Sequence, residues 1–191
     1  MKLAGEQKIN ATREVVFAAL NDTEILKQSI PGCEEIIKIS DTEMTAIVVL
    51  KIGPVKAKFK GSVQLSNLNS PESYTISGEG KGGPAGSAKG GADVKLVEDG
   101  QNTILQYDVS ASVMGKFAQL GNRLIDSTAK KLAAQFFEKF GEIVETQSGS
   151  KEKLDEIAPV VSNSENGLFG KPVVWIALAV VAAVILASQL L

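Results

Sequence analysis

The spacing of apolar residues changes along the chain, and each change predicts a different kind of element. Between residues 33 and 113, apolar residues recur at every second position, which is typical of strands that bury one face. Turn signals such as Gly53-Pro54 divide this region into hairpins. The predicted strands cover residues 34–39, 44–52, 57–67, 73–80, 88–98 and 102–113.

Helical spacing flanks this region on both sides. After a first strand within residues 1–10, apolar residues three or four apart predict two short helices, which Pro31 and Gly32 bring to an end. A long helix is predicted from about Gly115 to Glu145, and its apolar stripe must face the sheet. This order predicts an α+β fold in which a curved antiparallel sheet surrounds one long C-terminal helix.

The last residues of the chain lack a polar face. Residues 173–191 contain no charged side chain, and as a helix they would extend about 28 Å, which matches the hydrocarbon core of a bilayer. A buried core helix is the alternative, although such helices usually keep a polar stripe. Lys171 precedes the run and no positive charge follows it, so we expect the folded part on the cytoplasmic side of the cell membrane.

These patterns predict three parts of the chain. Residues 1–147 form a folded domain, and residues 148–171, which are rich in Ser, Asn and Gly, form a flexible linker. Residues 172–191 form a single-pass transmembrane anchor. The first ten residues alternate in polarity and have no long apolar run, so we expect no secretory signal.

The composition excludes several kinds of chemistry. The 191 residues contain no histidine and one cysteine, Cys33. Histidine-based nucleophile systems, imidazole metal sites and iron–sulfur clusters all need residues that are missing. The net charge of −2, with Lys and Glu interspersed, argues against a nucleic-acid surface. We therefore expect no catalytic residue, no metal-binding residue and no covalently bound cofactor.

Strand alternation defines an expected inner face of the sheet. The space between a curved sheet and a long helix often holds an apolar ligand, although ordinary core packing explains the same residues. Gly32, Gly83 and Gly86 are expected to shape the mouth of this cavity. The candidate ligand-binding residues lie at inner strand positions and at the entry to the long helix: Phe59, Tyr74, Tyr107, Met114, Phe117, Leu120 and Leu124.

Lysines occupy alternate positions on the outer face of one predicted strand. Lys56, Lys58 and Lys60 are candidates for contact with anionic lipid or with an acidic partner. Outward lysines also protect sheets from aggregation, and this simpler interpretation remains open.

Three segments of the chain resemble a known family. The glycine-rich residues 78–91 are not a phosphate loop, because a strand follows where a helix should begin. Residues 30–33 (IPGC), 88–94 (AKGGADV) and 115–125 (GKFAQLGNRLI) instead resemble the carbon monoxide dehydrogenase G-subunit family. The resemblance implies a START-like, helix-grip (SRPBCC) domain. It also implies an accessory role, since members are associated with molybdenum hydroxylases such as aerobic carbon monoxide dehydrogenase and are thought to bring them to the membrane.

The anchor, the expected cavity and the resemblance together predict an accessory protein rather than an enzyme. We expect it to recruit a molybdenum hydroxylase to the bilayer and to bind a lipophilic molecule. A respiratory quinone would link the enzyme to the electron transport chain. Tyr74 or Tyr107 is the candidate donor to a quinone carbonyl.

Two alternatives stay open. In the first, side chains fill the cavity and the protein is a tether or assembly factor without a ligand. In the second, it is a small-molecule-converting enzyme of the helix-grip superfamily, with Glu79, Asp93, Asp108 and Arg123 as candidate acid–base groups. Alternation places several of these four side chains outward, which favours solvated surface charge.

Overall fold

The computed structural model describes the backbone of residues 1–155 and the side chains of residues 1–148. The chain divides into two units, Met1–Ile157 and Ala158–Leu191, and all described residues belong to the first. Within the described residues, no helix is long and apolar enough to cross a membrane. The predicted anchor at residues 172–191 lies outside them.

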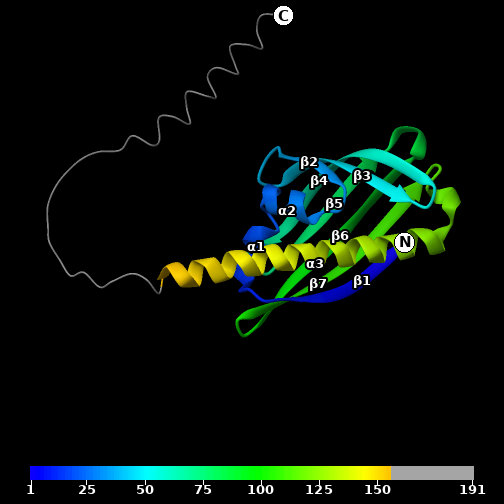
Figure 1. The fold of residues 1–191 in the computed structure, drawn as a ribbon. Helices are drawn as coiled ribbons and strands as arrows, with labels where there is room; N and C mark the ends of the chain where they lie inside the picture. Colours follow the sequence, from blue (N-terminus) through cyan, green and yellow to red (C-terminus); the bar gives the residue numbers. More distant parts are fainter. Residues whose placement is uncertain (156–191) are drawn as a thin grey trace, which may run out of the picture. The chain divides into compact units, whose positions relative to one another are not determined.

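Seven strands form one curved antiparallel sheet in the order β1-β7-β6-β5-β4-β3-β2 (Figure 1). The predicted antiparallel sheet with a long C-terminal helix is confirmed. The strands are β1 (Lys2–Ile9), β2 (Cys33–Lys38), β3 (Glu43–Ile52), β4 (Val55–Asn69), β5 (Ser73–Lys81), β6 (Ser87–Asp99) and β7 (Asn102–Met114).

The helices lie between and after these strands. Helices α1 (Arg13–Ala19) and α2 (Thr23–Ser29) connect β1 to β2, and α3 (Asn122–Asp155) crosses the sheet (Figure 1). Short 3-10 turns, η1 (Gly83–Ala85) and η2 (Ala118–Leu120), precede β6 and α3. Helix α3 begins seven residues later than predicted and continues to Asp155, so the domain boundary predicted at residue 147 falls inside it.

Local chemistry explains the short helices. The Asp22 carboxylate caps α2 by accepting hydrogen bonds from the backbone N–H groups of Glu24 and Ile25, at 2.8 and 3.1 Å. Gly32 follows α2 with φ of +76°, and a Cβ there would collide with the Val49 carbonyl of β3. Only glycine therefore allows the chain to turn so closely against the sheet. Gly32 thus serves the passage from α2 to β2.

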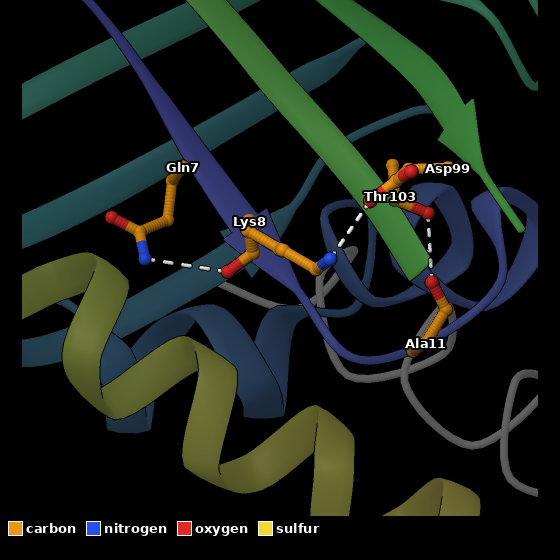
Figure 2. Close-up of polar contacts among 5 residues, drawn as sticks. All are labelled: Gln7, Lys8, Ala11, Asp99 and Thr103. Atoms are coloured by element: carbon orange, nitrogen blue, oxygen red, sulfur yellow. Dashed lines mark hydrogen bonds and ion pairs between the residues drawn. The ribbon is translucent and has the colours of Figure 1, made fainter. Parts of the chain in front are cut away.

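The main core fills one half of the inner face of the sheet. The C-terminal half of α3 contributes Phe140 and Val144, which are fully buried against α1, α2 and the strands. At the edge of this core, the buried Thr103 hydroxyl donates to the Ala11 carbonyl at 2.8 Å, and Lys8 pairs with Asp99 at 2.8 Å (Figure 2). These contacts fasten the β6–β7 hairpin to the passage from β1 into α1.

Candidate functional site: an uncovered floor beneath the long helix

The inner face of the sheet carries two separate apolar clusters. The main core occupies one half of the face, and a smaller cluster at the other end is built around Phe59, Ala85 and Phe117. The rings of Phe59 and Phe117 lie 5.4 Å apart between centroids. The two clusters share no buried residue, so the middle of the face is packed differently from either end.

Small residues occupy the middle of the inner face. They form two adjacent rows that run across the strands through successive register partners. The first row, from β3 to β6, consists of Ala46, Gly61, Gly80 and Ala88. The second row, from β5 to β7, consists of Gly78, Gly90 and Ala111. We call these seven residues the small-residue floor. All seven are half-buried, and Ala46 and Gly61 also line a depression on the outer face of the sheet.

Helix α3 does not fill the space above this floor. A Cβ built on Gly61 would meet, within 4 Å, only backbone atoms of Glu79 and Gly80. A Cβ built on Gly80 would meet only the Phe59 ring and the Lys60 carbonyl. All of these atoms belong to β4 and β5, and no described atom of α3 is among them. Space for added side-chain atoms therefore exists above Gly61 and Gly80, whereas a Cβ on Gly78 or Gly90 would clash with the backbone of a neighbouring strand.

The side chains around this space are apolar and only partly covered. Val48, Val63 and Ile76 lie at inner positions next to the floor and are half-buried. On α3, Leu132 is also half-buried and belongs to neither cluster, and Ala129, one turn before it, is small. We call the space between the floor and this part of α3 the hollow. It has the apolar lining that a lipophilic ligand requires.

One polar group on α3 stands out. The Asp126 Oδ1 atom is shielded from solvent and has no hydrogen-bond partner among the described residues. Asp126, Ala129, Ala133 and Phe137 form one stripe along the helix, and Phe137 stacks on Tyr107 of β7, 5.1 Å between centroids.

Asp126 lies near the start of α3. The helix begins just after β7 ends, and Phe137, eleven residues after Asp126, stacks on Tyr107 of β7. Eleven helical residues rise about 16 Å, which equals about five strand residues. Asp126 therefore lies about 16 Å along the helix from the Phe137–Tyr107 contact.

The structure divides the seven predicted ligand-binding residues among three environments. Phe59, Phe117 and the half-buried Leu120 form the smaller cluster, which is one end wall of the hollow. Met114 and Leu124, with 57% and 36% of their surface exposed, lie on the outside. The predicted residues therefore do not form a single groove.

The two tyrosines belong to the main core. Tyr74 is buried with its ring edge against Phe17, at 5.7 Å, and burial raises the pKa of its hydroxyl. The Tyr107 hydroxyl lies against Gly5 of β1, where a Cβ would be 2.6 Å from it. These contacts place neither hydroxyl in the hollow. This argues against the predicted role of the two tyrosines as hydrogen-bond donors to a quinone carbonyl.

The glycine-rich segment shapes the end wall. Gly86 and Gly115 approach so closely that a Cβ on either would clash with backbone of the other strand end. Gly82, which the sequence did not single out, is buried, and a Cβ there would be 2.7 Å from the Phe59 ring. Gly83 has φ of +57° and no described atom within 4 Å of such a Cβ, so it sits at the open end of the loop.

The candidate acid–base groups lie on the other side of the sheet or on the surface. Asp93 and Asp108 are exposed register partners on the outer face, and the Thr75 hydroxyl donates to Asp93 at 2.8 Å. Glu79 is an exposed partner of Lys81, 3.5 Å away, and Arg123 is exposed. Two open depressions of about 500 and 390 Å³ occur on this outer face, and charged or polar side chains line much of both.

The fold and the hollow define a START-like domain: a helix-grip sheet with one long helix laid across it. Solved structures of this class are similar to the chain. A START superfamily protein from Mycobacterium smegmatis aligns with a TM-score of 0.53 at 16% identity, over 74% of this chain and 98% of that one. An aromatase/cyclase from Streptomyces aligns with a TM-score of 0.57 at 9% identity, over 78% of this chain and 95% of that one.

The chain belongs to the carbon monoxide dehydrogenase G-subunit (CoxG) family, whose model matches residues 5–145. The resemblance inferred from the sequence is thereby confirmed. A conserved protein from Geobacillus kaustophilus is similar, with a TM-score of 0.72 and 28% identity over 76% of this chain and 96% of that one. No curated protein matches the chain. Family and fold together indicate a ligand-binding accessory protein.

Proposed function

We propose that this protein binds a lipophilic molecule in the hollow and serves a molybdenum hydroxylase of the carbon monoxide dehydrogenase type as a membrane accessory. The observation that carries the ligand part is the small-residue floor, where no described atom of α3 lies within 4 Å of a Cβ built on Gly61 or Gly80. Burying an apolar chain there is favourable by about 25 cal/mol for each Å² removed from water. The name of the family supports a dehydrogenase as the partner.

A respiratory quinone is the ligand that this role requires. An oxidation that releases electrons needs an acceptor, and a quinone dissolved in the bilayer is out of reach of a soluble enzyme. A carrier with an apolar hollow would withdraw the quinone and present it to the enzyme. The anchor predicted at residues 172–191 would keep the folded unit beside the cytoplasmic face of the membrane.

The ligand is tested by filling the hollow. Full-length protein is purified from quinone-producing cells, and the bound lipids are extracted with organic solvent and identified by mass spectrometry. Ala46→Phe places a ring over the floor, whereas Ala4→Phe places the same ring on the exposed outer face of β1. We expect quinone with the native protein and with Ala4→Phe, and at least about tenfold less with Ala46→Phe.

Two outcomes would contradict the proposal. Equal quinone on the native protein and Ala46→Phe would exclude the hollow as the site. A native protein without any extractable lipid, which still binds the hydroxylase in a pull-down, would favour the simple tether. Thermal unfolding of both variants serves as the control for folding.

A further inference from the structure

Three segments that are distant in the sequence meet at one end of the folded unit Met1–Ile157. The backbone N–H of Phe117 donates to the Ala85 carbonyl at 3.2 Å, and a Cβ on Gly53 would lie 3.3 Å from the Leu124 side chain. The β3–β4 turn, the η1 loop and the segment from β7 to α3 therefore form one surface. We call residues 50–57, 80–87 and 112–125 together the basic tip.

The basic tip carries only positive charge. Its three segments contain no Asp or Glu, while the whole chain has a net charge of −2, so the tip is strongly opposite in sign to the rest. Among the described residues, only Lys81 of the tip has a carboxylate partner, Glu79 at 3.5 Å. The positive side chains are all exposed: Lys51, Lys56, Lys81, Lys116 and Arg123.

Apolar side chains are exposed between these charges. Met114 and Leu124 are exposed, as are Pro54 and Pro84 at the ends of their loops. Phe117 of the smaller cluster is only 2% exposed and holds the segment from β7 to α3 against the sheet. Exposed apolar residues that are grouped and bordered by charge mark an interaction surface rather than ordinary variation.

We propose that the basic tip docks on an anionic lipid bilayer. Unpaired lysines close to such a surface each contribute about 1 kcal/mol of attraction to the headgroup charge. Met114 and Leu124 offer methyl groups and no hydrogen-bonding group, so they match the boundary between headgroups and acyl chains better than the polar surface of an acidic protein. This docking belongs to the folded unit itself, and it does not depend on the anchor or on the identity of the ligand in the hollow.

Vesicle co-sedimentation tests the docking with residues 1–157. This unit is compact by itself and contains all the described strands and helices, and its use removes the apolar residues 173–191. Vesicles of phosphatidylcholine with about one third phosphatidylglycerol are compared with pure phosphatidylcholine. We expect binding to the anionic vesicles only, and binding should weaken as salt is raised.

Charge reversal identifies the surface. Lys51→Glu, Lys56→Glu and Lys116→Glu together should weaken binding about tenfold or more. The matched control is Lys95→Glu, Lys130→Glu and Lys131→Glu, which changes the net charge equally at exposed sites outside the tip. An equal loss of vesicle binding in both triple variants would show that only the net charge of the unit matters, and it would overturn the proposal.

The apolar contribution is tested separately. Met114→Ser with Leu124→Ser should weaken vesicle binding, whereas Ile39→Ser with Leu68→Ser removes exposed apolar side chains elsewhere and should not. Binding of the unit to soluble polyglutamate with no binding to vesicles would overturn the lipid assignment in favour of an acidic protein.

Discussion

At the scale of single residues, Asp126 and Arg13 each have one buried side-chain atom without a hydrogen-bond partner among the described residues, Oδ1 and Nε respectively. An unpaired buried acceptor such as the Asp126 Oδ1 costs about 1–3 kcal/mol. We expect Asp126→Leu to raise the free energy of unfolding of the ligand-free protein by about 1 kcal/mol, measured by chemical denaturation. Glu138→Leu, at an exposed site on the same helix, should change it by less than about 0.5 kcal/mol.

A loss of stability in Asp126→Leu would show that the carboxylate has a favourable interaction that outweighs its desolvation. The same variant also reports on the ligand. If a bound quinone is reduced, its hydroxyl would be a donor for this oxygen, and Asp126→Leu would then lower its retention.

Tyr74 gives the protein an alkaline limit. Burial raises the pKa of its hydroxyl, so the folded state keeps the proton at a pH where the unfolded chain, with a pKa of about 10, has lost it. The contribution of the un-ionised Tyr74 hydroxyl to folding stability is intact below about pH 10. It is lost as the pH rises from there towards the pKa that this hydroxyl has in the folded state. We expect the stability to fall from about pH 10 upwards in chemical denaturation.

Tyr74→Phe should reduce this alkaline fall, since the ionising group is removed and the ring contact with Phe17 is kept. Tyr107→Phe is the matched control and should retain the fall. An unchanged pH profile in Tyr74→Phe would assign the loss to other groups.

At the scale of elements, the strands could be predicted almost to the residue, but the start of the long helix could not. Polarity alternates along each strand because one face is buried, and hairpin turns set the limits. Phe117, Leu120 and Leu124 have helical spacing, yet Gly115 and Gly121 adopt φ of +84° and +87°, which interrupts a helix. The apolar side chains of that segment form the smaller cluster and the tip instead.

Gly115 joins the end of β7 to the η1 loop, and we expect it to tolerate no side chain. A Cβ there would lie 2.5 Å from the Gly86 Cα, in addition to the strain of a positive φ. Gly115→Ala should lower the free energy of unfolding by about 2 kcal/mol or more. Gly83→Ala should lower the free energy of unfolding by only about 1 kcal/mol, the strain of a positive φ, because no described atom lies within 4 Å of the added Cβ. Equal losses of unfolding free energy in the two variants, measured by chemical denaturation, would show that the loop relaxes around the clash at residue 115.

At the scale of the whole molecule, the sequence predicted which residues face inward but not which of them α3 covers. Alternation assigns Tyr74 and Phe59 to the same face, and the crossing of α3 then places one in the core and the other in the end wall. The floor was equally hidden, because its residues are adjacent only through the register of five strands. The charge of the tip was visible only in part, through Lys56, since its segments meet only in the fold.

The small-residue floor also has a consequence for motion. Glycine has no side chain to pack and weakens a strand, so β4, β5 and β6 are least supported at the point where α3 leaves them uncovered. The backbone amides of these central strands should therefore open and exchange with solvent more readily than those beside the main core. A molecule that fills the hollow would supply the missing contacts. The middle of the sheet would then become slow to exchange only when the protein is loaded, so its rigidity would distinguish a full carrier from an empty one.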